Sequence, residues 1–301
     1  MNHLSRYELE FPHPIFKWAG GKTSLLKTFD SNNLIPESFG RYYEPFFGAG
    51  ALYFHLWSKG LVKKATLSDI NDELYNVYSL IKKDYNSLIT FSKDLDLDPN
   101  EKVYYLNRAK FNKLKSIPLE KCSHDQKLER AVLMIYLNKT CYSGMYRENR
   151  KGEFNVPCGK YNKPTILDDY NLYEVSKALK NVSLRNEDYK TIFKNPRKND
   201  FVYLDPPYMP YGEVSHFRDY HRTGFDNTEQ EKLCEMYKKL NNRQCKIMLS
   251  NSSSPKLNDM YESIPGVSIK TVSALRLINQ KNIGRAFVNE YVIINYPTKP
   301  Y

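Results

Sequence analysis

The sequence lacks an apolar run long enough to cross a lipid bilayer. Its first residues, MNHLSRYELEFPHP, carry charges and prolines in the place where a secretory signal peptide needs an apolar stretch. These two absences predict a soluble protein with no membrane partner, and we expect it in the cytoplasm.

Cysteine is scarce, and its spacing follows no known framework. The chain has five cysteines, an odd number, and none of them forms a Cys-x-x-Cys pair. Neither a disulfide framework nor a zinc site is therefore predicted, and we expect no bound metal. The pattern suits a reducing compartment.

Positive charge and tyrosine, in contrast, are abundant. Lys and Arg number 45 against 34 Asp and Glu, so the formal net charge is +11, and the chain has 25 tyrosines. This composition favours a polyanionic partner, with nucleic acid favoured over an anionic membrane. On composition alone, a merely lysine-rich protein without such a partner is an equal alternative.

The first part of the chain alternates helical and strand patterns. A helical stretch at Thr23–Phe29 is followed by a strand, a helix, a second strand and a second helix. Such alternation predicts an α/β fold with a parallel sheet. These four elements are expected at Arg41–Pro45, Ala51–Lys59, Ala65–Ser68 and Asp72–Lys83.

From about Asp84 to Tyr161 the character of the sequence changes. Two charge-studded helical stretches, Glu101–Lys115 and Gln126–Asn138, precede the basic, Gly-containing segment CYSGMYRENRKGEFNVPCGKY. The simplest interpretation is an α/β core interrupted by a helical insertion. Strand patterns then resume at Val182–Leu184, Phe201–Leu204, Lys246–Leu249, Ser268–Thr271 and Tyr291–Asn295.

The segment Phe16–Thr23 ends in Gly-Lys-Thr, like a phosphate-binding P-loop. That motif also needs a glycine where Phe16 stands, and no strand pattern directly precedes it. A nucleoside triphosphatase is therefore disfavoured.

A second motif, Glu44–Gly50, joins the first strand to the next helix. Glycines there let a ligand approach the backbone and the helix N-terminus. About 20 residues on, Asp69 ends the next strand and can accept hydrogen bonds from two ribose hydroxyls. Many nucleoside-binding folds share these features, but Tyr53 replaces the third glycine that a nicotinamide-dinucleotide enzyme needs.

The sharpest motif is Phe201–Tyr208, an apolar strand followed by Asp-Pro-Pro-Tyr. The prolines cannot extend a sheet and hold the loop rigid. The Asp205 carboxylate and a neighbouring carbonyl can grip an exocyclic amine, while Tyr208 can stack on the attached ring. The alternative for the tetrapeptide taken alone is a Pro-Pro turn with a capping Asp.

These three motifs, in this order, resemble the Dam-type branch (D12 class) of the DNA adenine-N6 methyltransferase family. The resemblance runs from Lys17 to Tyr296. It also includes Lys139–Arg147, Gly152–Pro157, Tyr220 with Phe225, Leu249–Ser252, Arg276–Asn279 and Tyr291–Tyr296.

The resemblance implies a Rossmann-like, S-adenosylmethionine (SAM)-dependent methyltransferase sheet formed by residues 1–83 and 166–301. Residues 84–165 would form an inserted helical target-recognition domain that bears a β-hairpin. It also implies SAM as cofactor, with Asp188 meeting its adenine; alternatively, Asp188 only caps a helix. The implied cofactor residues are Trp18, Lys22, Glu44, Phe46, Gly48, Gly50, Asp69, Asp188 and Asp205.

The implied catalytic residues are Asp205, Pro206, Pro207 and Tyr208. Asp205 and the Pro206 carbonyl would draw the adenine amine toward tetrahedral geometry, and Tyr208 would stack on a base flipped out of the duplex. Cys158 follows a proline, as the nucleophile of cytosine-C5 methyltransferases does. We interpret it as structural, because N6 transfer needs no covalent step.

Double-stranded DNA is the implied partner. Tyr142 would wedge into the base stack, Arg147 would read a guanine through O6 and N7, and Lys17 would contact the guanine before the target adenine. The implied target is GATC. The full set of DNA-binding residues is Lys17, Lys139, Tyr142, Ser143, Met145, Arg147, Pro157, Lys160 and Tyr161.

Several alternatives stay open at this point. Ser143 stands where the family commonly has Asn and Met145 where it usually has Leu, and relatives that read a longer palindrome share the arginine. An RNA substrate or a catalytically silent DNA-binding relative would share many of the motifs. A cognate restriction endonuclease acting on the same site, an independent role in the bacterial cell, and a phage origin are equally compatible with the sequence.

Overall fold

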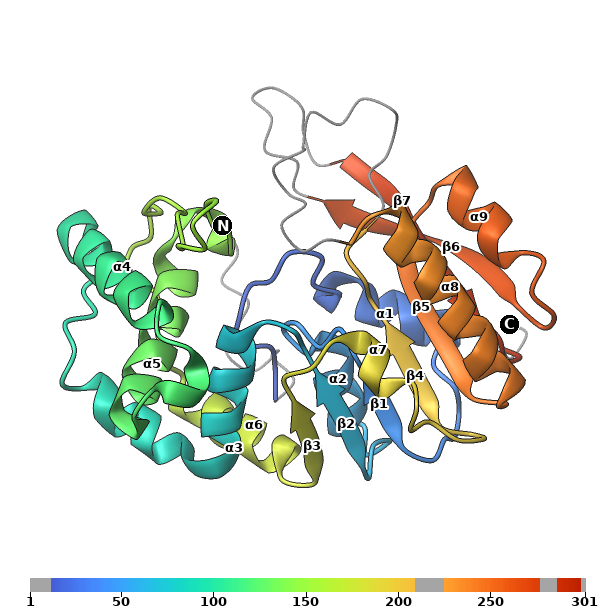
Figure 1. Cartoon of the computed structure of the whole chain (residues 1–301), viewed down its shortest axis with the longest axis horizontal. Coiled ribbons are helices and arrows are strands. Elements are labelled where there is room, and N and C mark those ends of the chain that lie inside the picture. Colours follow the sequence, from blue (N-terminus) through green and yellow to red (C-terminus); the bar gives the residue numbers. More distant parts are fainter. Residues whose placement is uncertain (1–11, 209–224, 277–285, 299–301) are drawn as a thin grey trace. The chain divides into compact units, whose positions relative to one another are not determined.

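The computed structural model describes residues 12–208, 225–276 and 286–298 (Figure 1). Tyr220 and residues 277–279 of the family motifs lie outside these residues, as does the side chain of Arg276. The helices are α1 Leu26–Ser31, α2 Ala51–Ser58, α3 Asp72–Ser92, α4 Glu101–Lys115, α5 His124–Thr140, α6 Asp169–Leu179, α7 Tyr189–Ile192, α8 Asn227–Asn242 and α9 Pro255–Tyr261, with 3-10 helices at Thr23–Leu25, Leu119–Lys121 and Tyr142–Gly144. The strands are β1 Tyr42–Glu44, β2 Ala65–Ser68, β3 Val182–Arg185, β4 Phe201–Leu204, β5 Lys246–Ser252, β6 Ser268–Arg276 and β7 Ala286–Ile294.

The strands form one mixed sheet in the order β3-β2-β1-β4-β5-β7-β6. β1 pairs in parallel with β2 and β4, and β4 pairs in parallel with β5, as the alternating pattern predicted. β7 is antiparallel to both β5 and β6, so the expectation of a parallel sheet is wrong at this edge. Buried strands of this kind read as continuous apolar runs, which is why β4 could be found in the sequence.

The chain divides into two compact units. We call residues 22–47, 64–67 and 187–301 the sheet unit, and residues 1–21, 48–63 and 68–186 the helical unit. The predicted division at 84–165 is a different one and stays a prediction.

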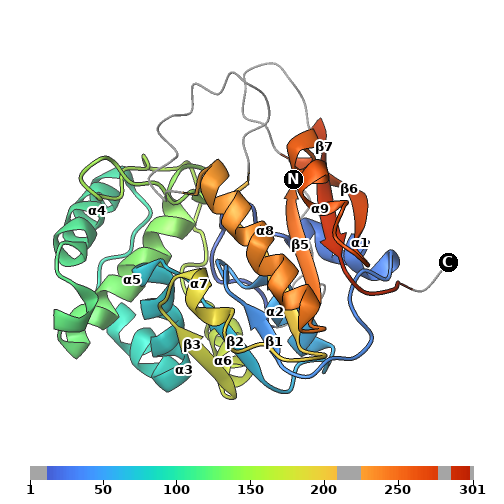
Figure 2. The same ribbon diagram turned by 45° about the vertical axis from the view of Figure 1, so that its right-hand side comes forward.

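The core of the sheet unit lies between strands β4 and β5 and helices α8 and α9. Figures 1 and 2 both show α8 lying along β5. The helices contribute residues at three- and four-residue spacing, which is the mark of one apolar face. These residues are Leu233, Tyr237 and Leu240 from α8 and Leu257 and Tyr261 from α9, against Val202, Leu204, Ile247 and Leu249.

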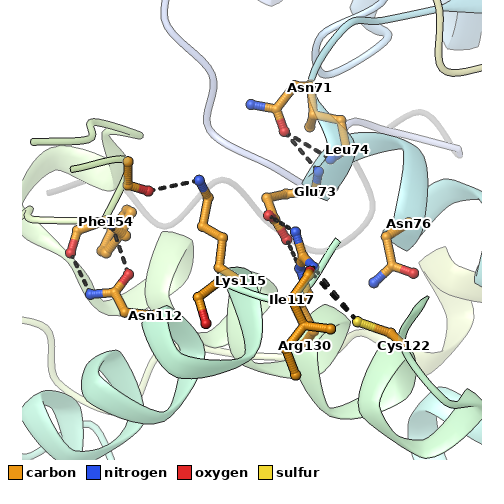
Figure 3. Close-up of polar contacts among 12 residues, drawn as sticks. Asn71, Glu73, Leu74, Asn76, Asn112, Lys115, Ile117, Cys122, Arg130 and Phe154 are labelled. Atoms are coloured by element: carbon orange, nitrogen blue, oxygen red, sulfur yellow. Dashed lines mark hydrogen bonds and ion pairs between the residues drawn. The ribbon is translucent and has the colours of Figure 1, made fainter. Parts of the chain in front are cut away.

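The helical unit is built around α5, which is buried almost all round from Ala131 to Asn138. A capping box of Ser123 and Gln126 starts this helix. In Figure 3 the Arg130 guanidinium faces Glu73 of α3, with Nε–Oε2 and Nη2–Oε1 distances of 2.8 and 2.6 Å. Both side chains are 2% exposed, so α3 and α5 are joined by a buried ion pair.

Several predicted elements have different ends in the structure. α3 continues to Ser92 through a break at Asp84 (φ −162°, ψ 84°), because Leu88 beyond the break is buried as well. β6 and β7 are longer than predicted. α6, α8 and α9 were not predicted, although each begins at a polar N-cap, namely Asp168, Asp226 and Ser254.

Candidate active site and DNA-contacting segment

Asp205 follows the last residue of the buried strand β4. Its two carboxylate oxygens lie 2.7 and 2.8 Å from Nζ of Lys22, which is 3% exposed. The sequence predicted Lys22 as a cofactor residue, whereas the structure places its ammonium against the predicted catalytic carboxylate. The two residues are 183 positions apart in the chain, and no spacing in the sequence indicates their contact.

Tyr208 belongs to the same cluster. Its ring lies below Nζ of Lys22, with 4.8 Å between the nitrogen and the ring centroid. Its hydroxyl donates a hydrogen bond to Oε2 of the buried Glu290 on β7, at 2.6 Å. The pKa of Tyr208 is raised, mainly by burial and next by the nearby charge of Asp205, so this hydroxyl keeps its proton. Sequence analysis missed Glu290, which no motif distinguishes from other strand residues.

The backbone of the Asp-Pro-Pro-Tyr loop is held from α8. Gln230 Nε2 donates to the Pro207 carbonyl at 3.0 Å, and Gln230 Oε1 accepts from Nδ2 of Asn251 at 3.2 Å. Both amide side chains are buried. Asn251 lies in a family motif, but Gln230 was not predicted, because α8 itself was not.

Three further predicted cofactor residues lie in the sheet unit. Glu44 accepts a hydrogen bond from the Tyr42 hydroxyl at 2.9 Å. The Phe46 ring stacks on Tyr189 with 5.0 Å between ring centroids. Asp188 is the N-cap of α7, where its carboxylate accepts from the Lys190 amide at 2.9 Å. Asp188 thus caps a helix, and its cofactor role stays a prediction.

The remaining cofactor residues lie in the helical unit around Asp69. The Asp69 carboxylate accepts hydrogen bonds from the backbone N–H of Gly48 at 2.8 Å and of Asn71 at 2.9 Å. Burial raises the pKa of Asp69 above its ordinary value, although these hydrogen bonds partly oppose the shift. Gly48 has a φ of +50°, and a Cβ there would lie 3.1 Å from Cδ1 of Trp18. Gly50 is the N-cap of α2. The glycine loop is thus fixed by Asp69 on one side and covered by an indole on the other.

The predicted DNA-contacting residues lie on and around residues 139–161, which we call the recognition segment. In place of a continuous hairpin ladder it has two isolated antiparallel bridges, Cys141↔Cys158 and Glu148↔Phe154. The side chain of Tyr142 is 46% exposed, and Ser143, Arg147, Pro157 and Lys160 are exposed as well, whereas Met145 and Tyr161 are half-buried. The pKa of the half-buried Lys139 is lowered, mainly by burial and to a smaller extent by the charge of Lys17.

Two contacts orient residues of the recognition segment. Nε of Arg147 donates to Oδ1 of Asn155 at 2.8 Å. The ring of Tyr146 stacks on the indole of Trp18, with 5.2 Å between centroids. Burial raises the pKa of the Cys158 thiol, which agrees with a structural role.

Comparison with known proteins identifies the family. The model of the family described as D12 class N6 adenine-specific DNA methyltransferase matches residues 18–278. The chain belongs to this family. The chain is therefore an adenine-specific DNA methyltransferase by family.

Three relatives of this N6 adenine-specific methyltransferase match almost the whole chain. The type II methyltransferase M.MjaIII of Methanocaldococcus jannaschii is 40% identical over 94% of this chain and 99% of its own length. M1.LlaDCHI of Lactococcus lactis subsp. cremoris, also a type II methyltransferase, is 34% identical over 98% and 99%. A DNA adenine methylase of Serratia marcescens is 30% identical over 92% and 96%.

The described residues contain neither a membrane-spanning helix nor a metal-binding cluster. In residues 12–208, 225–276 and 286–298, no helix has the length and apolar content to cross a membrane. Across the same residues, no group of three or more His, Cys, Asp or Glu side chains could hold a metal ion.

Proposed function

We propose that this protein transfers the methyl group of SAM to N6 of an adenine flipped out of duplex DNA, within GATC. The observation that carries the proposal is the Asp205–Tyr208 loop, whose carboxylate, backbone and ring are each held by a buried partner in a chain of the N6 adenine-specific family. When bound, the cofactor supplies an electrophilic methyl group on a sulfonium sulfur.

The residues of the helical unit fit the nucleoside part of such a cofactor. A carboxylate such as Asp69 can accept hydrogen bonds from both ribose hydroxyls, because its two oxygens together offer about four lone pairs. Its two backbone contacts fix the orientation of the carboxylate. Gly48 gives close access to the backbone beside the Trp18 indole, where any Cβ would be crowded. We assign Trp18, Gly48, Gly50 and Asp69 to cofactor binding on this basis.

The remaining residues proposed for cofactor binding lie in the sheet unit and are Lys22, Glu44, Phe46, Asp188 and Asp205. Phe46 offers an aromatic surface already stacked on Tyr189. The cap contact of Asp188 uses Oδ1. A carboxylate of this kind can accept a further bond from an adenine amino group.

The proposed catalytic step uses Asp205 and the Pro206 carbonyl as acceptors for the two N–H bonds of the target amine. An adenine amine delocalises its lone pair into the ring, and two well-placed acceptors favour the tetrahedral geometry that returns the lone pair to nitrogen. Asp205 can accept from Lys22 and from the amine together, because each carboxylate oxygen has two lone pairs. Lys22 therefore fixes the position of the Asp205 carboxylate, which can still accept a hydrogen bond from the target amine.

The recognition segment supplies the proposed DNA contacts. Tyr142 is an exposed aromatic residue suited to wedging between bases, as extrusion of the target base requires. Arg147 is anchored through Nε, while a bidentate contact to guanine O6 and N7 uses the terminal guanidinium nitrogens. Lys17, Lys139, Ser143, Met145, Pro157, Lys160 and Tyr161 complete the proposed set.

Two of the relatives described above are type II methyltransferases. We therefore propose a modification role beside a restriction endonuclease that reads the same site. The two type II relatives have higher identity to this chain than the adenine methylase of Serratia marcescens, and this difference favours the modification role.

The substrate class is tested by incubating the full chain with methyl-labelled SAM and either a DNA duplex or an RNA duplex of the same sequence. We expect label in the DNA alone, and N6-methyladenine in its nuclease digest by mass spectrometry. Label in the RNA alone would overturn the DNA substrate. Binding of duplex DNA without any label would favour a catalytically silent protein.

A further inference from the structure

Asn138 lies in the last turn of α5 and is 1% exposed. Its Oδ1 accepts a hydrogen bond from the backbone N–H of Lys17 at 2.9 Å, and its Nδ2 donates to the Lys17 carbonyl, also at 2.9 Å. The same Nδ2 donates to the Gly144 carbonyl at 3.0 Å. One buried amide thus joins the backbone of Lys17 to the recognition segment.

The side chain of Lys17 is confined after it leaves this joint. Gly144 has a φ of +64°, and a Cβ at that position would lie 2.8 Å from Cβ and 2.5 Å from Cδ of Lys17. Nζ of Lys17 lies over the ring of Tyr161, 4.9 Å from its centroid. The absence of a side chain at Gly144 leaves room for the start of the Lys17 side chain, and the ring of Tyr161 lies under its end. These two residues set the path of the Lys17 side chain.

We propose that Asn138 is a positioning residue for sequence specificity, which acts by holding Lys17 and the Gly144 turn in one register. This inference rests on the proposed function of Lys17 as the contact to the guanine before the target adenine. Discrimination between base pairs depends on where a donor lies relative to the base edge. Small displacements of a positioned group are costly in such sites. Loss of the joint should therefore weaken discrimination at the base pair that Lys17 reads.

Asn171 of α6 provides a matched control. Its Oδ1 accepts from the backbone N–H of His13 at 3.0 Å, and its Nδ2 donates to the His13 carbonyl at 3.0 Å. It is 3% exposed, and it holds the same N-terminal segment four residues earlier. His13 is not among the proposed DNA contacts. Asn138→Ala and Asn171→Ala thus remove similar clamps from the same segment, but only the first removes a clamp at a proposed base contact.

The experiment measures kcat/KM for the duplex that the wild-type protein methylates and for duplexes changed at one base pair at a time. The variants are Asn138→Ala, Asn171→Ala, Lys17→Ala and the double variant Lys17→Ala with Asn138→Ala. We expect Asn138→Ala to lower discrimination about tenfold at the base pair affected by Lys17→Ala and at no other, within the range of one base contact. Asn171→Ala should leave every ratio unchanged, and the double variant should equal Lys17→Ala.

Each other outcome has a distinct meaning. If Lys17→Ala changes no ratio, the proposed base contact of Lys17 is wrong. If Lys17→Ala changes one ratio and Asn138→Ala changes none, the positioning role of Asn138 is wrong. It is also wrong if Asn138→Ala changes the ratios at all base pairs alike, or if Asn171→Ala changes the same ratio as Asn138→Ala. Asn138→Asp keeps the acceptor for the Lys17 N–H and replaces Asn138→Ala in the same comparison if the alanine variant does not fold.

Discussion

The catalytic loop and the recognition segment are held in place by different means. The Asp205–Tyr208 loop follows a strand that is paired on both sides, with β1 and β5, so its start is fixed by backbone hydrogen bonds. The recognition segment has two isolated bridges and scattered backbone hydrogen bonds, such as those from Tyr142 N–H to the Pro157 carbonyl at 2.9 Å and from Asn155 N–H to the Arg147 carbonyl at 3.0 Å. Side chains of neighbouring helices hold its backbone as well.

Helix α4 shows how this second mode works. Asn112 contacts both the N–H and the carbonyl of Phe154, at 2.8 and 3.0 Å (Figure 3). The Tyr104 hydroxyl donates to the Val156 carbonyl at 2.8 Å, and Lys115 Nζ to the Gly152 carbonyl at 2.8 Å. Single substitutions in such a scaffold can reshape the segment without disturbing strand pairing.

The largest expected effect tests how far the helical unit depends on side-chain contacts. Arg130→Met leaves Glu73 buried without its charge partner, and removal of one member of a buried pair costs about 3–5 kcal/mol. The free energy of unfolding is measured in urea. Lys110→Met, which removes the partly exposed pair with Glu129, is the control and should cost at most about 1 kcal/mol. Equal losses in the two variants would contradict a dependence on the buried pair.

The next effect tests the catalytic loop. Asp205→Ala should lower turnover at least about a hundredfold, as loss of one oriented polar group does, while the protein still binds duplex DNA. Asp200 is a matched control at the other end of β4, where its carboxylate accepts from the N–H groups of Arg41 and Arg197 at 2.8 and 2.9 Å. Asp200→Ala should lower the free energy of unfolding and should lower turnover much less than Asp205→Ala does. Near-wild-type turnover of folded Asp205→Ala would refute its catalytic role.

A smaller effect concerns specificity in the recognition segment. Arg147→Ala should relax discrimination at one base pair by about 1–3 kcal/mol. Arg150, exposed in the same segment, is the control, and Arg150→Ala should weaken binding evenly across sequences. Relative methylation rates on duplexes with single base-pair changes give both quantities. An unchanged sequence preference in Arg147→Ala would show that Arg147 reads no base.

The smallest effect asks whether the ion pairs of the half-buried Glu229 add to the stability of the sheet unit. Hydrogen bonds from Lys190 and Lys232 lower the pKa of Glu229 to about 2. A lowered pKa means that the stabilisation is present above the ordinary value of 4.5 and is lost as the pH falls toward 2. Glu229→Gln should therefore cost less than about 1 kcal/mol at pH 7 and less still at pH 3. A loss that grows on acidification would contradict this sign.

The sequence predicted the parts of the molecule that follow a regular pattern. β2, β4 and α4 have the predicted ends, because apolar runs and charge-flanked periodicity mark them. α8 has an equally clear apolar face in Leu233, Tyr237 and Leu240, and the Asp226 cap could have revealed it. The family motifs led to Asp69 and Asp205 as candidate site residues.

Contacts between distant residues could not be predicted in this way. The pairing of Lys22 with Asp205, the role of Glu290 under Tyr208 and the joint at Asn138 depend on how separate elements pack. A single sequence carries no periodicity that reports such contacts. The recognition segment is a further case, because side chains of α4 and α5 bond its backbone at Gly144, Gly152 and Phe154.

The proposed methyl transfer from SAM to adenine within GATC is tested most directly by incubating the purified protein with methyl-labelled SAM and two duplexes. One duplex contains a GATC site, and the other differs only in that this site is scrambled. We predict label in the GATC duplex alone. Equal label in both duplexes would contradict the target sequence, and no label in either would contradict the reaction itself.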